Sequence, residues 1–328
     1  MSKLYPLIFD PIFKEKIWGG RKLKTHLNKE IGSVAHCGES WELSAVPQNT
    51  SVVSNGRLKG KNINDLLEQY KERLVGKKNY QKYGNDFPLL IKFLDAQQDL
   101  SVQVHPDDKL AQERYGQGAQ GKSEMWYVMD ADPGATLITG FKEKLTKDEF
   151  QKRVEGAKLE PVLNKEAVRA GDVFYIPAGR IHTIGEGILI AEIQQTADIT
   201  YRIYDFDRTD DEGNKRELHV EDALEALDFQ VYDSYKASYE HHYNERVELV
   251  NSPYFTTNKW DLSESVVIDY ESLDSFVILI GLDGKGKFTV DADDYILNKG
   301  DVYLIPAEIN NLKFSPFKHC VFLEVYIQ

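Results

Sequence analysis

The sequence predicts a mainly β protein built from two related β-domains, and three observations support that fold class. Short runs rich in Val, Ile, Tyr and Phe recur between Gly, Pro and Asp turns. Many short strands of this kind favour a sandwich or barrel over alternating strands and helices. The stretch GDVFYIPAGRIH at 171–182 recurs in weaker form as GDVYLIPAEINN at 300–311. Finally, 328 residues are enough for two domains with full cores.

Individual elements follow from periodicity and from capping residues. Asn64 can cap a first helix, and Pro106 can open a short one. Thr146 and Glu149 have the spacing of a capping box, and residues 220–227 are also predicted to be helical. Apolar runs bounded by turn residues are predicted strands at 89–94, 100–105, 124–129, 172–177, 276–282 and 301–306.

Composition and charge exclude several classes of function. No run approaches the roughly 18 apolar residues that span a bilayer, and the start lacks the pattern of a signal peptide, so we expect a cytoplasmic protein without membrane partners. Cys37 and Cys320 are expected to be unpaired thiols. The net charge of −13 repels nucleic acid. An anionic substrate would therefore need a local cluster of Lys and Arg.

The repeat is asymmetric at its last residue. Aligning the two copies places His182, a strong metal ligand, opposite Asn311. The polar segment 233–247 is expected to connect the domains. We therefore predict a catalytic domain over residues 1–235 with one metal site, and a degenerate C-terminal domain without metal ligands over residues 236–328.

Four residues form a candidate metal-ligand set. Gln103 and His105 lie two apart on a predicted strand and so share one face, which must find hydrogen-bond partners or a metal if it is buried. Glu124 lies on another predicted strand, and His182 begins a strand that faces the barrel interior. Two imidazoles, a carboxylate and an amide oxygen fit Zn²⁺ with one position open. The same set could hold Fe²⁺, Mn²⁺ or Co²⁺.

Seven segments now make a resemblance specific. The motif GDxxxIPxGxxH resembles a signature of the cupin superfamily, whose domains are jelly rolls of the double-stranded β-helix type. The chain as a whole resembles type I mannose-6-phosphate isomerases in their short bacterial form, over nearly all of its first 210 residues. The matching segments are WGG at 18–20, GESWELS at 38–44, FPLLIKFLDA at 87–96, LSVQVHPDD at 100–108, GKSEMWYV at 121–128, IPAGRIHTIG at 176–185 and DITYRIYDFDR at 198–208.

The resemblance implies two cupin-type domains and an isomerase that interconverts mannose 6-phosphate and fructose 6-phosphate. One Zn²⁺ per chain would be held by the four candidate ligands. Arg202 matches the family's catalytic arginine, and Lys122 and Lys92 match lysines of its active site. Ser123 departs from longer relatives, many of which have proline there, and we expect this to change the local turn without changing the ligand at Glu124.

The residues can also be assigned by chemistry. Aldose–ketose isomerisation through a cis-enediol needs a base and a fixed cation for the developing negative charge, and Arg202 suits the second role. Asp198 could orient Arg202. Lys92 interrupts an apolar strand, and a substrate phosphate would supply its partner. We also assign Trp18 and Glu39 to the sugar pocket. The base stays open among Lys122, Glu39, Glu42 and a metal-bound water.

Two other functions remain as alternatives. His105, Glu124 and His182 alone would make the two-histidine, one-carboxylate site of an iron-dependent oxygenase. A non-catalytic sugar-binding cupin is the second alternative. The sequence leaves the state of assembly open between monomer and homodimer, and the preferred 6-phospho-sugar open as well.

Overall fold

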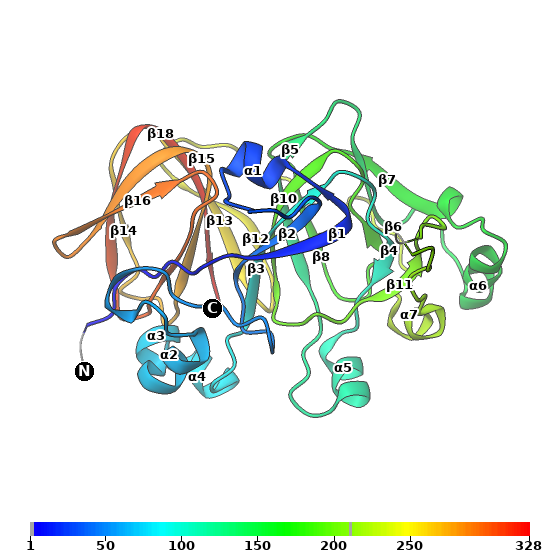
Figure 1. Ribbon diagram of the computed structural model, residues 1–328, viewed down its shortest axis with the longest axis horizontal. Coiled ribbons are helices and arrows are strands. Elements are labelled where there is room, and N and C mark those ends of the chain that lie inside the picture. The colour runs from blue at the N-terminus through cyan, green and yellow to red at the C-terminus, as the bar shows by residue number, and fades with distance from the viewer. Residues whose placement is uncertain (1–2, 210–211) are drawn as a thin grey trace.

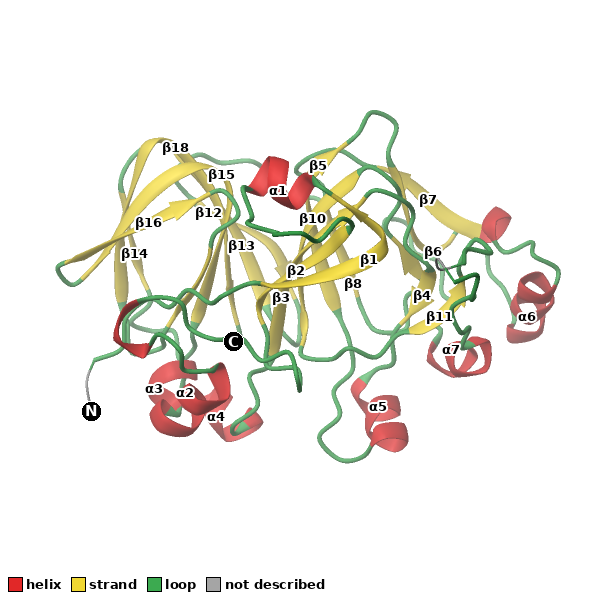
Figure 2. Cartoon of the chain, viewed as in Figure 1, coloured by secondary structure: helices red, strands yellow, loops and turns green. Residues whose placement is uncertain are grey.

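Two β-barrels lie side by side along the long axis of the computed structural model, which describes residues 3–209 and 212–328 (Figure 1). Strands form both barrels, and the helices lie at the periphery (Figure 2). This arrangement confirms the prediction of a mainly β chain with two cupin-type domains. Within the described residues, none of the helices is long and apolar enough to cross a membrane.

The first barrel consists of two antiparallel sheets. Its larger sheet has the order β1 (Ile12–Gly20), β2 (Cys37–Leu43), β3 (Leu89–Ala96), β10 (Ile188–Gln195), β5 (Glu124–Ala131) and β8 (Val173–Ile176). Its smaller sheet has the order β11 (Tyr201–Tyr204), β4 (Val102–Val104), β9 (His182–Thr183), β6 (Thr136–Phe141) and β7 (Leu163–Ala167). Every residue of β3 and β10 is buried, because one face points into the barrel and the other packs against the second barrel. Such two-sided burial explains their near-continuous apolar sequence.

The second barrel is one seven-stranded sheet. Its strands are β12 (Arg246–Asn251), β13 (Thr256–Leu262), β14 (Val266–Asp269), β15 (Val277–Val290), β16 (Asp293–Asn298), β17 (Val302–Ile305) and β18 (Asn311–Tyr326). The long strands β15 and β18 pair with each other, and each also pairs with short strands, so the sheet curves around its own core. Phe288, Phe314 and Phe322 stack at the centre of this core.

The helices are α1 (Lys22–Leu27), α2 (Ile63–Tyr70), α3 (Glu72–Val75), α4 (Lys77–Tyr83), α5 (Asp108–Tyr115), α6 (Lys147–Glu155) and α7 (Val220–Ala226). Short 3₁₀ turns occupy Gly56–Leu58 and Glu160–Val162. The predicted cap at Asn64 was wrong: Asn62 caps α2, because its side chain accepts the Asp65 amide and Asp65 reciprocates. The capping box of Thr146 and Glu149 is confirmed.

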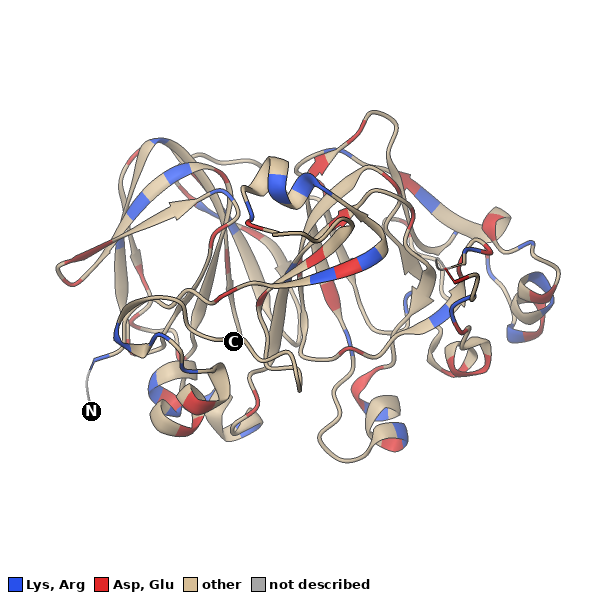
Figure 3. Ribbon diagram, viewed as in Figure 1, with Lys and Arg blue, Asp and Glu red and all other residues tan. Residues whose placement is uncertain are grey.

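The described charges of both signs are interspersed on the outer helices rather than segregated (Figure 3).

The two barrels are joined by one hydrophobic core that includes residues from Leu4 to Ile327. Leu7 exchanges backbone hydrogen bonds with Leu304 of β17, at 2.9 and 2.8 Å. Arg73 of α3 forms an ion pair with Glu308 at 2.6 Å. Segments near the N-terminus therefore pack on the second barrel, although they are distant from it in sequence. The division at residue 235 stays a prediction.

Candidate metal centre and adjoining cavity

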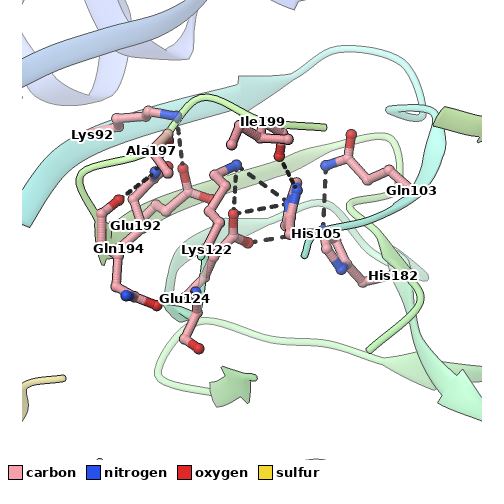
Figure 4. A network of polar contacts seen from close by, with 12 residues as sticks. Lys92, Gln103, His105, Lys122, Glu124, His182, Glu192, Gln194, Ala197 and Ile199 are labelled. Atoms are coloured by element: carbon pink, nitrogen blue, oxygen red, sulfur yellow. Dashed lines mark hydrogen bonds and ion pairs between the residues drawn. The ribbon is translucent and has the colours of Figure 1, made fainter. Parts of the chain in front are cut away.

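Three ligands of the predicted set converge inside the first barrel. His105 follows β4, Glu124 opens β5 and His182 opens β9. Their candidate ligand atoms all lie within 4.8 Å of one another, and all three residues are buried (Figure 4). Gln103 is the strand partner of His182, and its amide nitrogen lies 3.3 Å from His182 Nε2. Residues from distant parts of the chain thus meet because β4, β5 and β9 enclose one interior.

Backbone carbonyls orient both imidazoles. Nδ1 of His105 donates to the Ile199 carbonyl and Nδ1 of His182 donates to the Arg180 carbonyl, each at 2.8 Å. Each ring therefore turns Nε2 toward Glu124, the arrangement that commonly supports metal-ligating histidines. Burial and the neighbouring Lys122 ammonium lower the pKa of His105 to about 3. Burial also lowers the pKa of His182. Both rings are therefore neutral near pH 7, as metal ligation requires.

Glu124 supplies the negative charge of the set. Burial opposes its ionisation, but the Lys122 ammonium helps to hold the pKa of Glu124 well below its usual range. Lys122 Nζ lies 2.7 Å from Glu124 Oε1 and 3.3 Å from His105 Nε2. Two neutral imidazoles, one carboxylate and the Gln103 amide are a donor set that fits a divalent cation.

A cavity of about 330 Å³ opens beside these ligands. That volume is within the range of sites for small organic ligands. Its lining includes every predicted catalytic and substrate-binding residue: Trp18, Glu39, Lys92, Lys122, Asp198 and Arg202. Gln103 lines it as well, which places the predicted ligand set at its edge. Residues that the sequence analysis did not name, among them Lys16, Trp126, Glu192 and Arg216, complete the wall.

Glu192 is the main residue that sequence reasoning missed. It is the direct strand partner of Lys92, and Lys92 Nζ lies 3.3 Å from its Oε2. A protein carboxylate therefore supplies the partner that was expected from a substrate phosphate. Trp126 Nε1 donates to both Glu192 and Glu124, at 3.0 and 3.1 Å. Glu192 had the same signal as Lys92, namely a charge within an otherwise apolar strand.

Both members of this pair have a raised pKa, for different reasons. Burial and repulsion by Glu124 raise the pKa of Glu192. Burial opposes the charge of Lys92, but Glu192 and Glu39 raise the pKa of Lys92 above its ordinary value. Glu192 is thus a carboxyl group with increased proton affinity inside the cavity, a property typical of groups that transfer protons.

Glu39 and Glu42 lie on opposite faces of β2. Glu39 accepts a hydrogen bond from Trp41 Nε1 at 2.6 Å. Burial opposes its ionisation, but Lys92 and Lys16 lower the pKa of Glu39 to about 2. Glu42 instead pairs with Lys29 at 2.6 Å and does not line the cavity. These contacts leave Glu39 as an ionised wall residue and disfavour Glu42 as the base.

Arg202 lies on β11 opposite Gln103 of β4, next to the ligand set. Its guanidinium donates to the Glu217 carbonyl at 2.9 Å, and its buried Nε has no hydrogen-bond partner among the described residues. Asp198 lines the same cavity but makes no described hydrogen bond to it. Burial and the charge of Arg216 lower the pKa of Arg202. Because a guanidinium still stays charged, Arg202 presents to the cavity a cation that has no ion-pair partner in residues 3–209 and 212–328.

A cupin barrel with a buried His–Glu–His group beside a cation-lined cavity defines a candidate metal-site enzyme. Comparison with known proteins narrows this class. The type I phosphomannose isomerase catalytic domain matches residues 7–143, and the mannose-6-phosphate isomerase cupin domain matches residues 245–323.

Full-length relatives agree with these domain matches. The chain is 40% identical to mannose-6-phosphate isomerase of Streptococcus mutans, over 94% of this chain and 95% of that protein. It is 38% identical to mannose-6-phosphate isomerase ManA of Bacillus subtilis, over 96% and 98%. The crystal structure of the mannose 6-phosphate isomerase from Bacillus subtilis superposes with a TM-score of 0.88 at 34% identity, covering 98% of this chain and 99% of that one. The chain therefore belongs to the type I phosphomannose isomerase family, and it is an isomerase.

Proposed function

We propose that this isomerase interconverts mannose 6-phosphate and fructose 6-phosphate in a Zn²⁺-dependent reaction that proceeds through a cis-enediol. The observation that carries the proposal is the ligand set of two neutral imidazoles and one carboxylate at the edge of a cation-lined cavity of about 330 Å³. Membership of the family supports the substrate pair. It also favours this reaction over the oxygenase and the non-catalytic sugar-binding alternatives.

His105, Glu124, His182 and Gln103 would hold the metal. When bound, the ion supplies Lewis-acid polarisation of the substrate's oxygen atoms. The hydrogen bonds from both Nδ1 atoms to backbone carbonyls favour this role. They hold the proton on Nδ1, so the lone pair on Nε2 is free to bind the metal.

The protein's own groups supply proton transfer and charge stabilisation. The reaction moves a proton between C1 and C2, so the base must face the cavity. Lys122 and Glu192 both do, and Glu192 has the raised pKa that suits a group that accepts a proton and returns it. We propose Lys122 as the base that moves this proton and keep Glu192 as a second candidate base. Arg202, which is charged and has no carboxylate partner in the described part of the chain, would stabilise the enediolate.

The distribution of ion pairs indicates where the phosphate binds. The three cavity lysines each have a carboxylate partner: Lys16 with Glu39, Lys92 with Glu192 and Lys122 with Glu124. These pairs leave little net charge for an anion.

The arginine side of the cavity differs. Asp205 pairs with both Arg208 and Arg216, and no ion pair of the described residues involves Arg202. Among the residues that the structure describes, two guanidinium groups thus share one carboxylate, and that of Arg202 lies nearby without an ion pair. We propose that the phosphate binds at this side, near Arg216, rather than at Lys92.

A coupled assay of mannose 6-phosphate conversion, run on untreated, chelator-treated and zinc-restored protein, tests the proposed function. We expect turnover in the first, loss in the second and recovery in the third, with about one zinc per chain by metal analysis. Full turnover in protein shown to be metal-free would overturn the metal-dependent proposal. Absence of turnover in the zinc-loaded protein would overturn the substrate assignment.

A further inference from the structure

The backbone that carries Lys122 and Glu124 is held by three separate acceptors. The amide of Gly121 donates to Asp108 Oδ1 at 2.7 Å. The amide of Lys122 donates to the Pro106 carbonyl at 3.1 Å. The amide of Ser123 donates to Gln195 Oε1 at 3.0 Å. Three successive peptide groups are therefore fixed immediately before the ligand Glu124.

Asp108 is the centre of this network. Its Oδ1 accepts from both Gly121 and the Gln195 side chain, the second at 3.0 Å. Its Oδ2 accepts from the Tyr254 hydroxyl at 3.1 Å. Gly121 lies so close that a Cβ there would be 2.6 Å from the backbone of Asp108. The segment thus sits directly on the first residue of α5.

Tyr254 belongs to the second barrel, in the turn between β12 and β13. Ser252 Oγ accepts the amides of Tyr254 and Phe255, at 3.3 and 3.1 Å, and so fixes this turn. Phe255 is anchored in the core that joins the barrels. Burial and the nearby Asp108 raise the pKa of Tyr254, so the phenol keeps its proton and donates.

The second barrel acts on the cavity wall indirectly, since none of the lining residues comes from the described residues 236–328. The network also reaches the other ligands. The Ala178 amide donates to Ser123 Oγ at 3.2 Å, and the Gly179 amide donates to the His105 carbonyl at 2.9 Å. A shift at Asp108 would therefore be transmitted to the segments that carry Lys122 and Glu124.

We propose that Tyr254 is a positioning residue, through which the second barrel holds the Lys122–Glu124 segment by way of Asp108. The inference rests on the proposed function for its kinetic readout. A hydrogen bond to a carboxylate is stronger than one between neutral groups, so its loss frees one oxygen of Asp108 to move. The expected consequence is a misplaced cavity lysine and a weakened metal ligand, without loss of the fold.

The test compares Tyr254→Phe with Tyr239→Phe. Tyr239 is a matched control, because it is also a half-buried tyrosine of residues 236–328 and donates to the Gly171 carbonyl of the first domain at 2.7 Å, away from the cavity. At saturating zinc we expect Tyr254→Phe to lower kcat about threefold to tenfold with KM within about twofold, below the 10–100-fold typical of a partner in direct contact with a ligand. Tyr239→Phe should leave kcat unchanged.

Two further measurements separate positioning from simple stability. Zn²⁺ affinity, measured by competition with a chelating dye, should fall about threefold to tenfold in Tyr254→Phe alone. In an Asp108→Ala background, Tyr254→Phe should have no further effect on kcat or Zn²⁺ affinity. Equal kcat and Zn²⁺ affinity in the two tyrosine variants and the wild type would overturn the inference, as would additive effects in the double variant. Absence of mannose 6-phosphate turnover in the wild type would instead overturn the proposed function, and the Zn²⁺ arm would still decide this inference.

Discussion

The two barrels keep the same turns and differ where the first one binds its candidate metal. Gly171 and Gly300 open the repeated stretches, and both have positive φ, at 93° and 85°. That backbone region strongly favours glycine, so this turn is retained in both copies for geometric reasons. The common turn is therefore evidence of a shared fold and not of a shared metal site.

The strand registers show which residues of the second barrel occupy the positions of the candidate ligands. In the first barrel Gln103 pairs with His182, whereas in the second Asp269 pairs with Asn311, and both of these are exposed. The same comparison applies to β5, the strand that carries Glu124. Glu124 pairs with Ile176 in the first barrel.

The equivalent pair in the second barrel is Val277 with Ile305. A buried valine thus stands in place of the candidate ligand carboxylate. At three strands the second barrel thus has other residues at the positions of the candidate ligands, while it has the same turn and a similar apolar strand pattern.

The second barrel also contains a buried carboxylate, Glu324, which is stabilised by hydrogen bonds and an ion pair. Glu324 accepts from Tyr270 at 2.8 Å and from Asn258 at 2.9 Å, and it pairs with Arg246 at 2.9 Å. All of its partners come from the same barrel. Arg202 of the first barrel has no such carboxylate among the residues that the structure describes, and we propose that its charge is available to a ligand. A self-contained network indicates a structural role, and an unpaired cation beside a cavity indicates a binding role.

The largest expected effect comes from substituting alanine at the two equivalent positions, 182 and 311. His182→Ala should abolish metal binding and lower turnover at least about 10³-fold, more than the loss of an outer partner of a ligand. Asn311→Ala should leave both unchanged, because Asn311 is exposed and lies outside the candidate metal group found in the described residues. Metal analysis and the coupled assay measure both. Equal effects of the two substitutions would show that the barrels do not differ as described.

Arg202→Ala should retain zinc and lose about 10²–10³-fold in kcat, the cost of removing a preorganised group that stabilises developing charge. Arg202→Lys should recover only part of this, since an ammonium lacks the planar fork. Steady-state kinetics and metal analysis check the result. Loss of zinc, or unfolding, would make Arg202 structural.

Glu324→Ala should destabilise the protein by about 3 kcal/mol, because it leaves Arg246 and the buried polar groups without their acceptor. Zinc content and kcat of the folded fraction should stay at wild-type values. Urea unfolding measures the free energy of unfolding. The matched control is Asp294→Ala, which removes an exposed acid of β16 and should leave the unfolding curve unchanged. A change in metal content without a change in stability would contradict the structural role.

The smallest effect concerns pH. The pKa of Glu39 is about 2 in the folded protein against 4.5 ordinarily, so its ionised form stabilises the fold above pH 4.5. That contribution, about 3 kcal/mol at most, is lost as the pH falls from 4.5 toward 2. Urea unfolding of Glu39→Gln should therefore differ from the wild type at pH 6 and converge with it as the pH approaches 2. A difference in the free energy of unfolding that stays constant across this pH range would show that Glu39 does not contribute to the loss of stability in acid.

Much of the site could be predicted because its signals are local. The two-residue spacing of Gln103 and His105 defines one strand face regardless of the rest of the chain. Charges inside apolar strands are local signals too, and Lys92 was found in this way. Glu192 carries the same local signal within the apolar strand 188–195, so the sequence contains the information that points to it.

The tertiary structure alone decided which distant groups meet. The pairing of Lys92 with Glu192, the contact of Arg202 with the Glu217 carbonyl and the reach of Tyr254 to Asp108 depend on strand register and on how the barrels pack. Spacing along the chain carries no information about such contacts. The sequence by itself determined two β-domains with one ligand set, because turns and strand faces are encoded within a few residues. The partner of each buried charge was decided only when the strands closed into barrels, because burial forces a charge to pair with whatever group the fold brings beside it.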